Sequence, residues 1–202
     1  IMHSDNRLTT GLILKRIFDP TPRNNAEGIS CKGLWNGDGM IPPNYLANEF
    51  DGTDTHYIKS GATQVDSADL GDAIRKIRDK GYGLTPNSQL LILAHPSESE
   101  HIQTFRQGEE SRPESGIIAK HSFIPSKKAP AYLTPDSIVG EAIEGSFYGV
   151  ECLGSYGPAW LVETAFIPQG YVLVVASGGP GAQNNPVAFR IHPVESYQGL
   201  LA

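Results

Sequence analysis

The sequence predicts a mixed α+β domain with one central sheet and helices on its faces. One observation behind this prediction is a helical pattern of apolar residues between Asp66 and Tyr82. A second is a series of strand-length apolar segments in the last third of the chain, bounded by glycine and proline. Among them, Tyr171–Ala176 is an unbroken apolar run, typical of a strand buried on both faces. We therefore expect Tyr171–Ala176 to be the central strand.

Composition limits the classes of function. The 202 residues can bury one sizeable core, and the 22 glycines and 15 prolines favour long ordered loops over a helix bundle. A net charge of −6 argues against a dedicated nucleic-acid-binding protein, which needs a basic surface. No apolar segment approaches the roughly 20 residues of a membrane-spanning helix, and the first residues do not resemble a signal peptide. Cys31 and Cys152 lie far apart without a CxxC partner, which predicts free thiols.

The segment Leu8–Phe18 is predicted to be helical, because its apolar residues recur four positions apart. Two prolines, Pro20 and Pro22, end this helix, since proline lacks an N–H group and restricts the residue before it. The helical pattern starts close to residue 1, so we expect the beginning of the helix to lie before this chain, in a longer protein.

The segment Arg23–Ser60 contains several turn-forming clusters and no regular periodicity, which predicts a long irregular connection. Connections of this length within a compact domain are usually functional. Its isolated aromatic residues indicate that it packs against another surface. We expect this segment to be an arm that packs through Trp35, Tyr45 and Phe50.

The next segment, Asp66–Tyr82, has the clearest helical pattern. Asp66 or Ser67 can cap its N-terminal end, and Gly81 can adopt a left-handed conformation at its C-terminal end. Gln89–Ala94 follows as a short apolar run, which predicts a buried strand.

A second helix is predicted from Ser97 to Gln107, because Ser97 and Glu100 have the spacing of a capping box. The polar segment Glu109–Ala131 is predicted to be a long exposed loop around a short strand at Ile117–Ala119. Phe147–Leu153 alternates between apolar and other residues, which predicts one further strand.

No catalytic, cofactor-binding or metal-binding residue is predicted. No two of the six histidines have the three- or four-residue spacing of helical metal ligands, and the motifs HExxH and GxSxG are absent. The glycine-rich segment Ser177–Gly181 follows a strand, but no helix is predicted after it, and the lysine of a phosphate-binding loop is missing. We interpret it as a loop between strands. An α+β hydrolase that uses His95 stays open as a remote alternative.

Three segments resemble a known family: Gly145–Val150, Phe166–Ala176 and Asn185–Pro193. The second contains Pro-Gln-Gly-Tyr before an apolar strand, and the third reads Asn-Pro-Val-Ala-Phe-Arg-Ile-His-Pro. Together they resemble the C-terminal half of the major capsid proteins of tailed bacteriophages, of the Hong Kong ninety-seven type. Ala188 and Ile191 stand where that family has glycine and glutamate.

The resemblance implies a phage major-capsid-like fold in three parts. Residues 1–64 would form the end of the spine helix and the connecting arm of the peripheral domain. Residues 65–184 would form the axial domain, with a central mixed sheet, and residues 185–202 a return strand to the peripheral domain.

The implied function is that of a viral structural protein, without enzymatic activity or cofactor. Copies of it would assemble, in the cytoplasm of a bacterial host, into the pentamers and hexamers of an icosahedral head around double-stranded DNA. Scaffold, protease and portal proteins are further implied partners, whereas neither a membrane nor a specific nucleic-acid sequence is.

Two loops, residues 109–131 and 177–185, are expected to contact neighbouring subunits at the capsomer axis. An encapsulin-type compartment shell protein, which shares the fold but encloses protein cargo, stays open as an alternative. The residues expected at intersubunit contacts are Trp35, Tyr45, Phe50, Arg112, Lys127, Lys128, Gly179 and Asn184.

Overall fold

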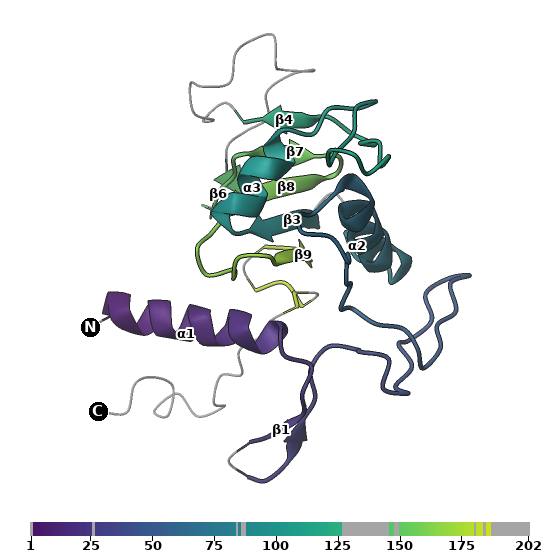
Figure 1. The fold of residues 1–202 in the computed structure, drawn as a ribbon. Coiled ribbons are helices and arrows are strands. Elements are labelled where there is room, and N and C mark those ends of the chain that lie inside the picture. The colour runs from purple at the N-terminus through teal and green to yellow at the C-terminus, as the bar shows by residue number, and fades with distance from the viewer. Residues whose placement is uncertain are drawn as a thin grey trace.

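The computed structural model describes residues 2–25, 27–83, 85, 88–126, 146–147, 150–179, 181–183 and 185–186. Within these residues, five strands form one mixed sheet, and α3 lies across one face of it (Figure 1). The elements are α1 (Met2–Ile17), β1 (Arg23–Asn24), β2 (Ser30–Cys31), α2 (Ser67–Asp79), β3 (Gln89–Ala94), α3 (Pro96–Gln103), β4 (Phe123–Pro125), β5 (Ser146–Phe147), β6 (Val150–Glu151), β7 (Gly154–Tyr156), β8 (Ala159–Glu163) and β9 (Val172–Ser177).

The five-stranded sheet has the order β4-β7-β8-β3-β9. β3 pairs in parallel with β8 and antiparallel with β9, so that Ile92 lies opposite Leu161 on one side and Val174 on the other. β7 continues the sheet antiparallel to β8, and β4 is antiparallel to β7. The prediction of a mixed α+β domain around one mixed sheet is therefore confirmed.

The prediction that Tyr171–Ala176 is the central strand is wrong. Its structural counterpart, β9, lies at one end of the sheet formed by the described residues, and Val172 to Val175 are half-buried. Strands β7, β8 and β3 occupy the interior of the sheet instead. A continuous apolar run indicates that both faces of a strand are covered. It does not indicate the position of that strand among the other strands of the sheet. Here one face of β9 packs on the core, while the ring of Tyr171 contacts Phe18 after α1, at a centroid distance of 5.1 Å.

The predicted helix after residue 66 is confirmed as α2. The Asp66 side chain accepts hydrogen bonds from the N–H groups of Ala68 and Asp69, and the Asp69 side chain accepts one from the Asp66 N–H group. This reciprocal arrangement is a capping box, which satisfies N–H groups that the first turn leaves without helical partners. At the other end Gly81 has a φ of 86°, the left-handed conformation that the sequence predicted.

The predicted capping box of Ser97 and Glu100 is not formed, and the second helix begins one residue earlier. Pro96 occupies its first turn, where a missing N–H group costs nothing. The cap is therefore His95, whose Nδ1 accepts a hydrogen bond from the Ser97 N–H group at 3.3 Å.

The second helix also ends four residues before the predicted Gln107. Arg106 Nη1 donates hydrogen bonds to the carbonyl groups of Gln103 and Phe105, at 2.9 and 2.8 Å. These bonds satisfy carbonyl groups at the end of α3 and let the chain turn inward. Phe105 consequently enters the core, where it is 1 % exposed.

Two strand predictions are wrong. Ile117–Ala119 forms no strand: Ile118 makes only an isolated bridge to Glu110 and is exposed. Phe147–Leu153 is not one strand either, because β5, which ends at Phe147, pairs antiparallel with β6. The alternating pattern of this segment is equally compatible with a tight pair of short strands.

The core lies between one face of the sheet and helices α2 and α3. Leu90, Ile92 and Ala94 alternate with half-buried residues along β3 and point to this face. Tyr156 crosses the core, and its hydroxyl group shares a buried hydrogen bond of 2.7 Å with Ser67 at the start of α2. The buried apolar cluster consists of Leu70, Ile74, Leu90, Ile92, Ala94, Ile102, Phe105, Ala119, Phe123, Tyr156, Ala159, Leu161 and Ala176.

Candidate functional site

The arm between β2 and α2 is fastened to the C-terminal half of α2. Lys80 Nζ lies 2.9 Å from Asp54 Oδ2 in the arm, and both side chains are largely buried. Neither atom makes a hydrogen bond of good geometry, so the attraction is mainly between the charges. The same ammonium group lies over the Phe50 ring, 4.4 Å from Nζ to the ring centroid, which is a cation–π contact. Lys76 Nζ, 3.5 Å from Asp54 Oδ1, adds a second cation.

These charges change the acidity of two arm residues. Burial alone would raise the pKa of Asp54, but Lys80 and Lys76 hold it below its ordinary value. Burial lowers the pKa of His56, and Lys80 lowers it further, whereas the carboxylate of Asp54 acts in the opposite direction. The arm is therefore held to α2 by an ionised Asp54 beside an uncharged His56 at neutral pH.

Tyr45 marks a second attachment of the arm to α2. Its N–H and C=O groups exchange hydrogen bonds with those of Asn48, which closes a tight turn. The Asn48 side chain donates to the carbonyl group of Asp79 at 2.9 Å. The Tyr45 ring packs so closely on Gly81 that a Cβ atom there would overlap it, which is a second reason for glycine at this position.

Trp35 packs within the arm itself. Its ring meets that of His56 edge to face, with centroids 5.4 Å apart, and the His56 N–H group donates to the Trp35 carbonyl group at 2.8 Å. Trp35, Tyr45 and Phe50 thus all have partners inside the chain. Their expected role between subunits stays a prediction.

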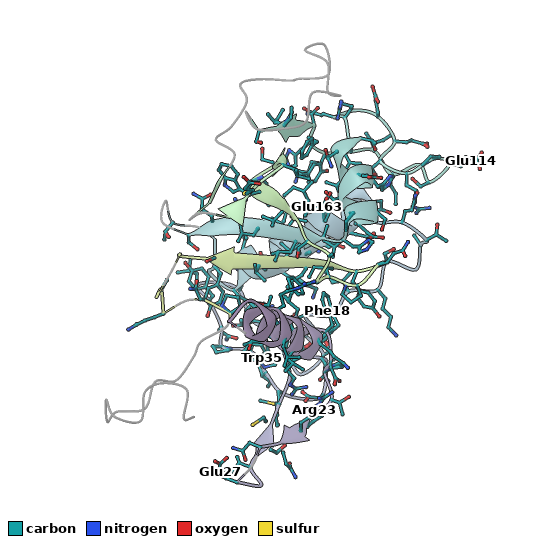
Figure 2. The ribbon with its side chains drawn as sticks, turned by 90° about the vertical axis from the view of Figure 1, so that its left-hand side faces the viewer. Phe18, Arg23, Glu27, Trp35, Glu114 and Glu163 are labelled. Atoms are coloured by element: carbon teal, nitrogen blue, oxygen red, sulfur yellow. The ribbon has the colours of Figure 1, made fainter. Side chains whose placement is uncertain are left out.

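The side chains that the arm leaves exposed are aliphatic, and the sequence interpretation missed them. The signal that could have identified them is the presence of aliphatic residues within polar, turn-forming clusters. Exposing such residues to water is unfavourable, and patches of them mark interaction sites. Figure 2 shows that the arm side also carries the β1–β2 hairpin, whose tip at Glu27 points away from the sheet. The exposed aliphatic residues of this part of the chain are Ile29, Leu34, Met40, Ile41, Leu46 and Ile58.

Arg112 belongs to a loop that is fastened to the opposite end of α2. Its Nη2 lies 3.4 Å from Asp66 Oδ2, the carboxylate that caps the helix. Ser111 Oγ accepts from the Ser67 N–H group at 3.0 Å, which brings the loop against the first turn. The loop extends outward to Glu114, at the projecting edge of the molecule (Figure 2). Arg112 therefore holds this loop in place, and a contact with a neighbour stays a prediction.

The glycine-rich loop after β9 is closed by one side chain. Asn185 Oδ1 accepts hydrogen bonds from Ser177 Oγ and from the Gly178 N–H group, at 3.1 and 3.0 Å. Asn185 Nδ2 donates to the Gly179 carbonyl group at 2.8 Å. Gly179 is buried inside this closure. The other expected contact residues, Lys127, Lys128 and Asn184, lie outside the described residues, as does most of the predicted return strand.

Replacing Asn185 with alanine is expected to open this loop without unfolding the sheet. Loss of three hydrogen bonds should cost about 1–3 kcal/mol locally. Hydrogen exchange of the Gly178 amide should therefore accelerate at least tenfold, while exchange in β3 stays unchanged. Asn185→Asp is the comparison variant, since it keeps the acceptor for Gly178 and replaces the donor to Gly179 with a carboxylate oxygen. Equal protection of Gly178 in the alanine variant would contradict this account of the loop.

His95, the residue considered for a hydrolase, lies in a cluster with Ser97 and Glu98. Its Nδ1 is 2.8 Å from Ser97 Oγ, and the Ser97 hydroxyl group donates to Glu98 Oε2 at 2.8 Å. Glu98 Oε1 accepts from the Gly170 N–H group at 3.1 Å. The cluster caps α3 and fastens the turn before β9 to it, which accounts for each contact without catalysis.

Within the described residues, no three His, Cys, Asp or Glu side chains gather closely enough to bind a metal ion. The same part of the chain has no helix with the length and apolar character to cross a membrane.

An open apolar groove of about 270 Å³ lies between α1 and the second face of the sheet. It is lined mainly by Ile13, Leu14, Leu93, Val162 and Phe166.

Comparison with known proteins connects the chain to a bacteriophage. No protein-family model matches it, and no curated protein does. A solved structure titled "Mycobacterium phage Patience" is similar, with a TM-score of 0.79 and 34 % sequence identity. The similarity covers 98 % of this chain and 53 % of that one, so the chain spans about half the length of that protein. The fold and sequence therefore support a phage-related protein.

Proposed function

We propose that this chain is the C-terminal portion of a major capsid subunit of a tailed bacteriophage. In this proposal, copies assemble into pentamers and hexamers of an icosahedral head that encloses double-stranded DNA, and the protein is located in the virion. The observation that carries the proposal is 34 % identity to a phage protein over 98 % of the chain, together with capsid-like sequence in β9 and its preceding turn.

The packing of the chain supports an assembling subunit. Ion pairs and hydrogen bonds fasten the arm and the two loops to α2 and to the sheet, so they form fixed surfaces. Yet the arm exposes several large aliphatic side chains, which is costly for a protein that stays monomeric. A shell subunit would bury such residues against its neighbours. Scaffold, protease and portal proteins would be transient partners, and neither an enzymatic activity nor a cofactor is needed.

The phage origin of the similar structure favours a genome-enclosing head over an encapsulin-type shell. The hydrolase alternative gains no support from His95, whose contacts are those of a helix cap.

The test is the mass of the full-length gene product after expression in bacteria, measured by light scattering over a range of concentrations. We expect pentamers, hexamers or particles of megadalton mass, and closed shells by electron microscopy. His95→Ala should leave assembly intact. A full-length product that is monomeric at every concentration, with and without its scaffold protein, would overturn the proposal.

A further inference from the structure

Leu46 has an unusual combination of exposure and backbone conformation. It is 86 % exposed, more than any other large hydrophobic residue that the structure describes. Its φ of 51° lies in the left-handed region, which a bulky side chain rarely adopts. Such a conformation is strained and persists only where the surroundings enforce it. The turn therefore holds an apolar side chain outward at a cost to the stability of the chain.

The surroundings of Leu46 do enforce this presentation. Tyr45 and Asn48 close the turn on both sides of it by paired backbone hydrogen bonds of 3.1 and 2.9 Å. Asn48 is tied to α2 through Asp79, and the Tyr45 ring rests on Gly81. Leu46 is thus a rigid apolar projection rather than part of a free loop.

The same turn carries negative charge. Glu49 and Asp51 follow Leu46 within five residues, and both are exposed. The Thr53 hydroxyl and N–H groups donate to the Asp51 carboxylate at 2.6 and 2.8 Å, and they lower its pKa. A surface that binds this turn should therefore be apolar at its centre and basic beside it.

The outer face of α1 has these two properties. Leu8 and Leu12 are 62 % and 58 % exposed, and they lie one turn apart on the helix. Lys15 and Arg16 continue the same face, at seven and eight residues from Leu8. The ion pairs found among the described residues include neither cation: Arg16 donates only to backbone carbonyl groups, those of Asp19, Thr21 and Cys31.

These two surfaces cannot meet within one chain. In Figure 1, the loops between β2 and α2 lie beyond the C-terminal end of α1, whereas its N-terminal half points to the opposite side of the molecule. A contact between them must involve two copies, and it uses a different surface on each copy. Contacts of this heterologous type repeat from copy to copy and generate rings or open arrays.

We propose that the Leu46 turn of one copy docks on the outer face of α1 in a second copy, with Leu46 against Leu8 and Leu12. Glu49 and Asp51 then face Lys15 and Arg16 across the contact. This inference deepens the proposed function, on which it rests, by naming one contact between neighbouring subunits. One apolar side chain and a few charges make a small interface, so the contact is weak in a pair and stable only where many copies repeat it.

The test is chemical crosslinking, which detects weak contacts, between two versions of the chain that each carry one introduced, exposed cysteine. Both carry Cys31→Ser, which removes the exposed native thiol, while Cys152 is buried. Leu46→Cys copies mixed with Leu12→Cys copies and a short bis-maleimide should give crosslinked heterodimers, severalfold more than either version alone. Ile118→Cys, exposed on another loop, replaces Leu46→Cys in the control mixture.

Charge reversal makes the test specific. Lys15→Glu in the Leu12→Cys copies should reduce the yield severalfold, and Glu49→Lys in the Leu46→Cys copies should restore it. Glu27→Lys, at the hairpin tip, should leave the crosslinking yield unchanged.

A yield no higher than that of the Ile118→Cys mixture would overturn the proposed contact. If full-length particles form while this pair fails to crosslink within them, the contact is wrong and the capsid function stands. If particles fail to form as well, both proposals fail.

Discussion

Replacing Asp54 with alanine should lower the free energy of unfolding by about 3 kcal/mol, because Lys80 is left buried without a counter-charge. The Lys80 side chain is only 7 % exposed, and Asp54 Oδ2 lies 2.9 Å from its ammonium group. The arm should also detach from α2, which hydrogen exchange at Gly37 and His56 would report. Chemical denaturation measures the loss of stability.

A matched control is Asp72→Ala, which breaks the pair of Asp72 and Arg75 on the exposed surface of the same helix. That change should cost well under about 1 kcal/mol, since solvent screens exposed pairs. The double replacement Asp54→Leu with Lys80→Met should recover most of the lost stability, because it removes both charges together. Equal effects of Asp54→Ala and Asp72→Ala would show that the arm is not held by this pair.

Titration of His56 gives an independent measure of the same charges. Lys80→Met should raise the pKa of His56, whereas Asp54→Ala should lower it, because the lysine depresses this pKa and the carboxylate raises it.

The pair of Asp54 and Lys80 also predicts that the attachment of the arm depends on pH. The pKa of Asp54 is lowered from 3.8 by folding, so its contribution is complete above that value and is lost as the pH falls through the lowered pKa. Acid should therefore release the arm, and two-dimensional NMR at decreasing pH would follow it.

Gly154→Ala should destabilise the sheet by about 3 kcal/mol, since a side chain there cannot be accommodated. A Cβ atom at Gly154 would overlap the Phe123 ring and the Ile124 carbonyl oxygen. The oxygen belongs to the backbone of β4, which pairs with β7 at this point, so it cannot move without breaking the pairing. Thermal unfolding and circular dichroism would measure the effect.

Gly71→Ala is the control for this prediction. Gly71 lies inside α2, and no atom lies within 4 Å of the position of its missing Cβ. Alanine there should raise the stability by about 0.5–1 kcal/mol, because glycine weakens a helix interior. Similar losses in both variants would mean that the packing at Gly154 is not as tight as the structure shows.

Local signals in the sequence predicted the local structure well. Asp66 and Gly81 bound α2 because capping and left-handed backbone conformation depend on residues within one turn. Gln89–Ala94 is a strand with the predicted bounds. Pro96 and Arg106 show the limit of such signals. Each shifts an end of α3 through its own backbone or side-chain chemistry, which the spacing of Ser97 and Glu100 did not reveal.

The partners of the candidate contact residues could not be predicted, because they come from distant parts of the chain. Phe50 packs under Lys80, Tyr45 on Gly81, and Arg112 against Asp66. Isolated aromatic residues in an irregular segment indicate packing against some surface, but not that the surface is the chain's own α2. The exposure of Leu46 and its left-handed φ could not be predicted from the sequence either. Both follow from the contacts that anchor the turn to α2.

By itself, then, the sequence determined the class of the fold, a mixed α+β domain, together with the capped helix α2 and the strand β3. Only the tertiary structure decided the order of strands, which places β9 at the end of the described sheet, and the attachment of the arm to α2. The physical reason is that periodicity and capping act within a few residues. Strand order and buried ion pairs depend on contacts between residues far apart in the chain, whose energies no local pattern records.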